Sequence, residues 1–239
     1  MPKVIGIIGG IAPPSTIEYY RKIISGFQEK GRTPQYPSIV INSIDMTRML
    51  DLVAQHKLDE LVGYLSGEIQ KLKDGGAEFA AMASNTPHIV FEELQKRARI
   101  PLISIVRAVM EYAKTLGLKK LGLFGTKSTM ESGFYQTEFS KQGMEIVTPP
   151  MESRNYIHEK YMNELVKGIF LEGTGNAMRD IVGQMRQRDK IDGVILGGTE
   201  LPFILKEQDF GNFKLLNTTD IHIESILTYA MNDHNHGIK

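Results

Sequence analysis

The 239-residue sequence has the composition of a globular protein, with 41% hydrophobic and 23% charged residues, and its length suits one large domain or two smaller ones. Its 28 basic and 28 acidic residues balance, so there is no net positive field to attract nucleic acid or an anionic membrane, and we expect neither partner. The sequence contains no cysteine, which excludes disulfides, thiolate metal sites and thiol nucleophiles.

Several other classes of protein are also disfavoured. No apolar stretch approaches the roughly 18 residues of a membrane-spanning helix. The opening apolar run is too short for a signal peptide, so the expected location is the cytoplasm. The glycines at 6, 9 and 10 lack the spacing of a dinucleotide-binding loop, and residues 125–128 lack that of a phosphate loop. Histidine and acidic residues show no metal-site spacing, so we expect no metal.

Short apolar runs alternate with amphipathic segments in the first half of the chain. The pattern predicts helices at 17–27, 58–75, 87–97 and 106–116, and strands at 4–8, 38–42, 79–83 and 101–105. Strands that alternate with helices indicate a parallel sheet with right-handed crossovers.

The same pattern then restarts. Strands are predicted at 121–124, 145–147, 193–196 and 213–216, and helices at 133–142, 156–170, 177–188 and 221–231. Gly10 and Asn85 are 75 positions apart, and Gly125 and Thr199 are 74 positions apart. This repeat predicts two pseudo-symmetric, Rossmann-like, three-layer α/β domains with mainly parallel sheets.

The predicted domain division is discontinuous. We expect one domain at 1–100 plus 211–239 and a second at 101–210. The last strand and helix are assigned to the first domain because the second half already has its strands.

Small polar residues follow one strand in each half. Ser84, Asn85 and Thr86 end the third strand, and Gly198 and Thr199 end the equivalent strand of the second half. Ligands of open α/β sheets bind at the carboxyl ends of strands, and free N–H groups there favour an anion. A carboxylate site in a cleft between the halves is one interpretation, and helix capping by Ser84, Asn85 and Thr199 is the other.

Three motifs resemble one protein family. Residues 9–16 read Gly-Gly-Ile-Ala-Pro-Pro-Ser-Thr, residues 125–130 read Gly-Thr-Lys-Ser-Thr-Met, and residues 164–168 read Glu-Leu-Val-Lys-Gly. They resemble the signatures of the cofactor-independent aspartate/glutamate racemases, of the Asp/Glu/hydantoin racemase superfamily, and the likeness runs from residue 4 to about 222. The resemblance implies an active site between two α/β domains, no cofactor and a homodimer.

The resemblance also implies two catalytic cysteines, whose positions here hold Ser84 and Gly198. In the family, one thiolate removes the α-proton and the opposite thiol returns one. A serine hydroxyl without an activating partner is far too weak a base, and glycine has no side chain. The nearest titratable substitutes are Asp45, His88 and Glu200, and the alternative for each is a cap or a surface residue.

Residue 198 is also expected to leave room for a water or a larger substituent. A helix start near His88 is expected to keep its imidazole neutral.

The resemblance places Arg48 where some members hold the substrate's distal carboxylate, which an arginine fork suits. The alternative is an exposed arginine at a helix start. Lys167 could assist from the other domain or be a solvated helix lysine, and Tyr135 could donate into the cleft or pack in the core. The polar groups expected to bind substrate are Asn85, Thr86, Thr126 and Thr199.

The sequence therefore predicts a racemase-family protein that acts on or binds an amino acid or dicarboxylate, without two-cysteine racemisation. Two alternatives remain open: a cofactor-free isomerase or lyase on a carboxylate substrate, and a non-catalytic carboxylate-binding protein.

Overall fold

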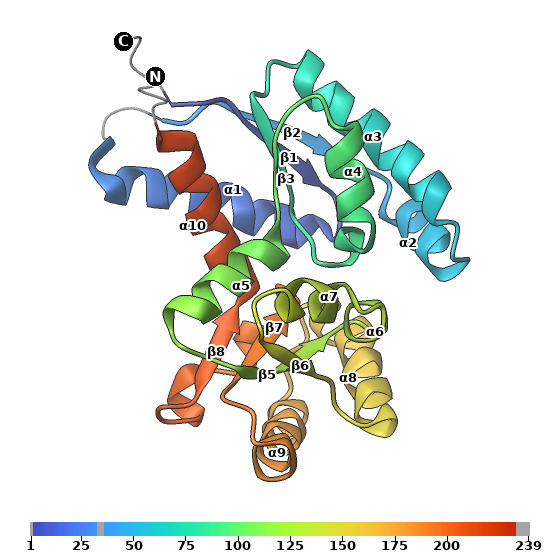
Figure 1. Cartoon of the computed structure of the whole chain (residues 1–239), viewed down its shortest axis with the longest axis vertical. Helices are drawn as coiled ribbons and strands as arrows, with labels where there is room; N and C mark the ends of the chain where they lie inside the picture. The colour runs from blue at the N-terminus through green and yellow to red at the C-terminus, as the bar shows by residue number, and fades with distance from the viewer. Residues whose placement is uncertain (1, 33–35, 233–239) are drawn as a thin grey trace. The chain divides into compact units, whose positions relative to one another are not determined.

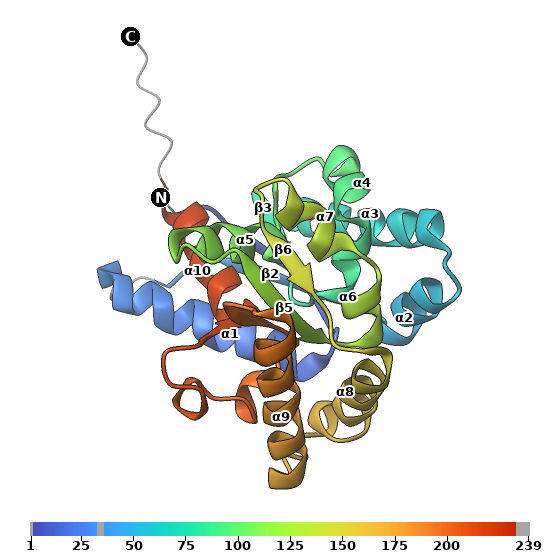
Figure 2. The same cartoon turned by 60° about the horizontal axis from the view of Figure 1, so that its bottom comes forward.

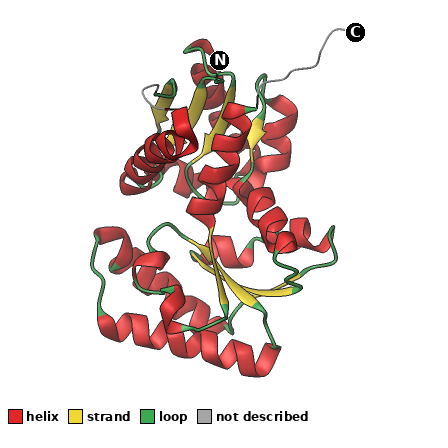
Figure 3. Ribbon diagram, turned by 90° about the vertical axis from the view of Figure 1, so that its left-hand side faces the viewer, coloured by secondary structure: helices red, strands yellow, loops and turns green. Residues whose placement is uncertain are grey.

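The computed structural model describes residues 2–32 and 36–232. Residues 1 and 233–239, which the sequence assigned to the first domain, lie outside this part. The chain forms two compact units: unit 1 comprises Met1–Ser104 and His222–Lys239, and unit 2 comprises Ile105–Ile221. Each unit is a parallel sheet with helices on both sides (Figures 1 and 3), which confirms the predicted α/β fold.

Unit 1 is built on a four-stranded parallel sheet of order β2-β1-β3-β4. In chain order, its strands and helices are β1 Ile5–Gly9, α1 Pro13–Phe27, β2 Ile39–Ser43, α2 Met46–Ala54, α3 Leu58–Asp74, β3 Phe79–Met82, α4 Phe91–Arg97 and β4 Leu102–Ile103. The C-terminal helix α10, Thr218–Met231, belongs to this unit from His222 onward. The central strands β1 and β3 are buried along their whole length. Burial on both faces explains their continuous apolar sequences.

The side chains of the unit 1 sheet alternate between two cores. Ile8, Ala80 and Met82 pack with α2, α3 and α4, whereas Ile7 and Ala81 pack with α1 and α10. Successive residues of a strand point to opposite faces, so one sheet serves both helix layers. Figures 1 and 2 both show α10 beside α1.

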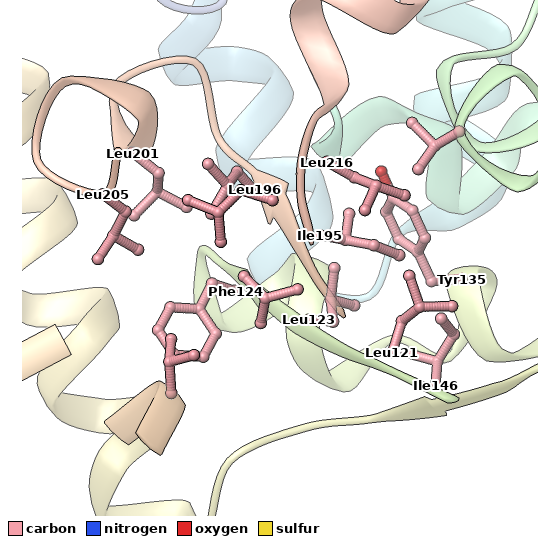
Figure 4. Packing of buried hydrophobic residues seen from close by; sticks show 14 of the residues in the cluster. Leu121, Leu123, Phe124, Tyr135, Ile146, Ile195, Leu196, Leu201, Leu205 and Leu216 are labelled. Atoms are coloured by element: carbon pink, nitrogen blue, oxygen red, sulfur yellow. The ribbon is translucent and has the colours of Figure 1, made fainter. Parts of the chain in front are cut away.

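Unit 2 repeats this topology with a parallel sheet of order β6-β5-β7-β8. Its strands and helices are α5 Ile105–Thr115, β5 Lys120–Gly125, α6 Lys127–Glu131, α7 Phe134–Ser140, β6 Glu145–Val147, α8 Met151–Asn163, α9 Glu172–Asp189, β7 Gly193–Gly197 and β8 Lys214–Asn217. Figure 4 shows part of its core, in which Leu123 and Phe124 of β5 lie beside Ile195 and Leu196 of β7.

Short helical turns complete the fold. They are η1 Gln28–Arg32, η2 Thr86–Val90, η3 Leu165–Lys167, η4 Leu201–Phe203 and η5 Glu207–Asp209. Among the described residues, no helix has the length and apolar character needed to cross a bilayer.

The sequence predicted that the chain returns to the first domain at residue 211, and the structure corrects this boundary. β8 pairs with β7 in unit 2, with Leu215 opposite Val194, so the chain returns at residue 222 and not at 211. Only α10 carries it back. Without β8, the buried strand β7 would have an unpaired edge, and its N–H and C=O groups would lack partners.

Three helical segments also differ from expectation. The sequence pattern did not predict α2 or α6, which have nine and five residues. The helix predicted at 156–170 begins earlier and ends at Asn163, and the turn η3 that follows stops at Gly168, whose φ of 75° suits glycine.

The close packing of α10 on α1 should contribute strongly to stability. A Cβ placed on Gly26 would lie 2.5 Å from the Leu227 side chain, which is 2% exposed. We expect Leu227→Ala to lower the free energy of unfolding by about 2–5 kcal/mol, measured by urea denaturation. Ile17→Ala, at a residue 69% exposed on α1, should cost less than about 0.5 kcal/mol. Equal effects would show that α10 is not packed on α1.

Candidate functional site

The turn after β1 requires glycine. Gly10 has a φ of +85°, and a Cβ there would lie 2.5 Å from the carbonyl oxygen of Ile44. Its N–H donates to Oγ1 of Thr16 at 2.8 Å. This bond ties the end of the strand to the first turn of α1.

The segment after β3 is held by buried side chains of its own unit. The Ser15 hydroxyl donates to the carbonyl of Ala83 at 2.8 Å, and Nδ1–H of His88 donates to the carbonyl of Ser84 at 3.0 Å. Ser84 is half-buried, while Asn85 and Thr86 are buried. The structure thus brings these three predicted residues together at one strand end, in a fixed backbone conformation.

Two buried histidines lie beneath this segment. Nε2 of His222 is 3.0 Å from the carbonyl oxygen of Ile103, and its Nδ1 is 2.8 Å from the Tyr19 hydroxyl. Because a carbonyl only accepts, Nε2 carries the hydrogen and Nδ1 accepts from Tyr19. The His88 and His222 rings are nearly perpendicular, with centroids 6.2 Å apart.

Burial keeps both imidazoles neutral. It lowers the pKa of His222 to about 4. Burial and then the neighbouring His222 lower the pKa of His88 to about 3. The neutral state expected for His88 therefore arises chiefly from desolvation and not from a helix start.

Arg48 and Asp45 lie after the end of β2 and are exposed. The Asp45 carboxylate accepts from the backbone N–H of Arg48 at 3.2 Å and caps α2, so the capping interpretation holds for Asp45. The Arg48 guanidinium stacks over the Tyr64 ring, 4.4 Å from its centroid. This stacking orients the guanidinium on the surface of unit 1.

Three residues predicted for unit 2 have ordinary structural surroundings. Thr126 caps α6 by accepting from the N–H of Thr129 at 3.2 Å. Lys167 is exposed at the end of η3. Tyr135 is fully buried in the core, and burial raises the pKa of its hydroxyl. Of the two interpretations of Tyr135, packing in the core is therefore the one that the structure shows.

The space beside Gly198 is filled by Tyr161. A Cβ built on Gly198 would lie 2.4 Å from Cε2 and 2.7 Å from the hydroxyl oxygen of Tyr161. Room for a water or a larger substituent was expected here. That expectation is wrong, because an aromatic ring from α8 occupies the volume.

The Tyr161 hydroxyl donates to a buried carboxylate. Oε2 of Glu200 accepts from Tyr161 and from the Thr199 hydroxyl, the latter at 2.7 Å. Glu200 is 6% exposed and Tyr161 7%. Burial and then the Glu200 charge raise the pKa of Tyr161 well above its usual value, so the phenol stays protonated and remains a donor.

Helix capping does not explain Asn85 or Thr199 at the polar strand ends. The Asn85 side chain forms no capping bond to η2, and the Thr199 hydroxyl bonds Glu200. Sequence reasoning did not find Tyr161, Tyr19 or His222, which come from helices distant in the chain. The sequence signal for Tyr161 was Gly198, a residue without a side chain where the resemblance implies a cysteine. Among the described residues, no three His, Asp or Glu side chains cluster in a way that could hold a metal ion.

Known proteins resemble this chain in sequence and in fold. A model of the family described as Asp/Glu/Hydantoin racemase matches residues 8–226. The Bacillus subtilis broad specificity amino-acid racemase RacX is 29% identical over 147 residues, which are 60% of this chain but only 63% of that protein's length.

Two solved structures are similar over nearly the whole chain. An aspartate racemase homologue from Pyrococcus horikoshii OT3 is 33% identical with a TM-score of 0.84. A provisional Asp/Glu racemase from Yersinia pestis is 31% identical with a TM-score of 0.89. Each match covers 96% of this chain and 100% of the other.

The buried histidines should make stability depend on pH. Their ordinary pKa is 6.5, whereas the folded state keeps them neutral to about pH 4. The unfolded state therefore binds more protons in this range, and the unfolding free energy falls as pH drops from about 6.5 to 4.5. His222→Gln should reduce this fall by roughly 1–3 kcal/mol in urea titrations at several pH values. His56→Asn, at an exposed histidine, should leave it unchanged. Parallel curves for wild type and His222→Gln would contradict this assignment.

The exclusion between residue 198 and Tyr161 should appear in a double-mutant cycle. We expect Gly198→Ala to destabilise the protein by about 1–3 kcal/mol in wild type, and clearly less when Tyr161→Leu has removed the contacting ring atoms. Gly183→Ala in α9, where an added Cβ meets no atom within 4 Å, should be neutral or stabilising. Additive effects at 198 and 161 would refute the steric exclusion.

Proposed function

Because the chain belongs to the Asp/Glu/hydantoin racemase family, we propose that it binds or acts on a small carboxylate, either an amino acid or a dicarboxylate, without two-cysteine racemisation. The observation that carries the second part is the absence of cysteine from the whole sequence, in which Ser84 and Gly198 stand where the resemblance implies the family's cysteines. Inversion by two thiols needs an acid and a base on opposite faces of the substrate, and here neither position supplies one.

The proposal assigns ligand binding to the carboxyl ends of the strands in both units, in the cleft that the family resemblance implies. Asn85 and Thr86 follow β3, and Thr199 follows β7, where small polar groups and backbone N–H groups suit a carboxylate. Arg48 is proposed to hold a distal carboxylate. Thr126 and Lys167 complete the proposed set, as the resemblance implies. A homodimer and a cytoplasmic location belong to the same proposal.

One observation favours an enzyme over a passive binding protein. Glu200 is a buried carboxylate beside the position of a missing thiol, and buried titratable groups are common where chemistry occurs. A cofactor-free isomerase or lyase acting on a carboxylate substrate is therefore the second function that we consider. A non-catalytic carboxylate-binding protein would bind the same ligands without exchanging their protons.

Binding and inversion can be measured separately. Calorimetry should detect L-aspartate, L-glutamate or succinate with a dissociation constant between about 1 μM and 1 mM. Chiral chromatography should detect no inversion of the amino acids. Binding of none of these ligands would refute the proposed ligand class, and rapid inversion by wild type would refute the loss of racemisation.

Restoring the thiols provides a stricter test of the geometry. Because Tyr161 occupies the space needed at residue 198, Ser84→Cys with Gly198→Cys should fail to racemise aspartate. Adding Tyr161→Leu should raise inversion at least about tenfold over that double variant, since the thiols act as a pair. The matched controls are the triple variant reverted at residue 84 or at residue 198. Inversion by either control would show that the two positions do not form an acid–base pair.

A further inference from the structure

Glu200 has an asymmetric environment. Its Oε2 accepts the hydroxyls of Tyr161 and Thr199. No described residue donates a hydrogen bond to its Oε1. Among the described residues, three side-chain atoms are shielded from solvent and lack a hydrogen-bond partner: Ser66 Oγ, Gln136 Oε1 and Thr219 Oγ1. Glu200 Oε1 is not one of them, so it is not fully shielded from solvent. One carboxylate oxygen is therefore anchored, and the other has no hydrogen-bond partner among the described residues and keeps some contact with solvent.

The position of Glu200 suits chemistry at the end of β7. The strand ends at Gly197, and Glu200 lies three residues later, where η4 begins. Gly198 offers no side chain, and the Tyr161 ring excludes one. The titratable group at this strand end is consequently the carboxylate of Glu200, oriented by Tyr161 and Thr199.

We propose that Glu200 is the catalytic base of this protein, and that its substrate is a 2-oxo carboxylic acid. This inference rests on the proposed binding of small carboxylates and names the class that reacts. In the step, Oε1 takes a proton from the carbon next to the ketone. The C–H electron pair forms the C=C bond of an enolate, and the ketone oxygen takes the negative charge. Return of the same proton, or of one exchanged with solvent, restores the ketone and the carboxylate.

The strength of the base selects this substrate class. A carboxylate is a weaker base than a thiolate. The α-proton of an amino acid is only weakly acidic because no ketone stabilises the resulting carbanion. A proton beside a ketone is far more acidic, and carboxylates serve as the base in ketone isomerases. Glu200 is therefore matched to a keto acid and not to aspartate or glutamate.

A single base also predicts the stereochemistry. Ser84 is a poor acid–base group, so the proton should leave and return through Glu200 on one face. With 2-oxoglutarate in D₂O, the enzyme should place one deuterium at C3 stereospecifically, whereas spontaneous exchange labels both positions. Proton NMR of the C3 methylene distinguishes the two patterns.

The test compares exchange with binding in four variants. Glu200→Gln preserves acceptance from both hydroxyls and should slow C3 exchange about 100-fold or more. Its 2-oxoglutarate affinity by calorimetry should change less than about threefold, since it loses mainly the base. Glu200→Asp and Thr199→Val, which keep a carboxylate but misplace it, should slow exchange about tenfold. Glu152→Gln, at an exposed glutamate on α8, is the matched control and should match wild type.

The outcomes separate this inference from the proposed function. Binding of 2-oxoglutarate without exchange above the spontaneous rate would overturn the inference alone. Exchange that survives Glu200→Gln would overturn the role of Glu200, and faster exchange of aspartate or glutamate would overturn the substrate class. If no amino acid, dicarboxylate or keto acid binds, both proposals fail. If Glu200→Gln does not fold, full exchange activity in both Glu200→Asp and Thr199→Val would overturn the assignment.

Discussion

A steric exclusion governs the carboxyl end of β7, because the Tyr161 ring and a side chain at residue 198 cannot occupy the same space. With glycine at 198, the ring lies against the backbone and its hydroxyl reaches Glu200. The carboxylate is thereby anchored through one oxygen while buried in a unit that has few other polar groups in its core. Burying a charge is costly unless such bonds compensate, so the glycine, the phenol and the carboxylate depend on one another.

Much of the fold could be predicted because short apolar runs ending in glycine are a strong local signal. β1 and β7 were expected within one residue of their observed ends. The place of β8 could not be predicted, because its pairing with β7 depends on which edge is free and not on its own four residues. The helix α2 was not among the predicted elements, although a cap at Asp45 and a helix start at Arg48 were both among the interpretations that the structure bears out.

The polar strand ends could be found from the sequence, but their partners could not. Ser84 and Glu200 could be assigned to strand ends because each follows a predicted strand closely in the sequence. Tyr161 lies 39 positions from Glu200, and Tyr19 lies 203 positions from His222. No local pattern encodes contacts of that separation. The burial of His88 and His222, which determines their charge, likewise follows from tertiary packing and not from helix position.

The absence of cysteine from the sequence has a consequence for chemical durability. Thiolates are the groups that peroxides and alkylating agents attack first, and oxidation beyond the sulfenic acid is largely irreversible. A strand end that presents a carboxylate and hydroxyls has no such target, and the sequence holds no thiol elsewhere. The sequence therefore offers no thiol for peroxides or alkylating agents to modify, and the carboxylate and hydroxyls at this strand end are not themselves redox-active.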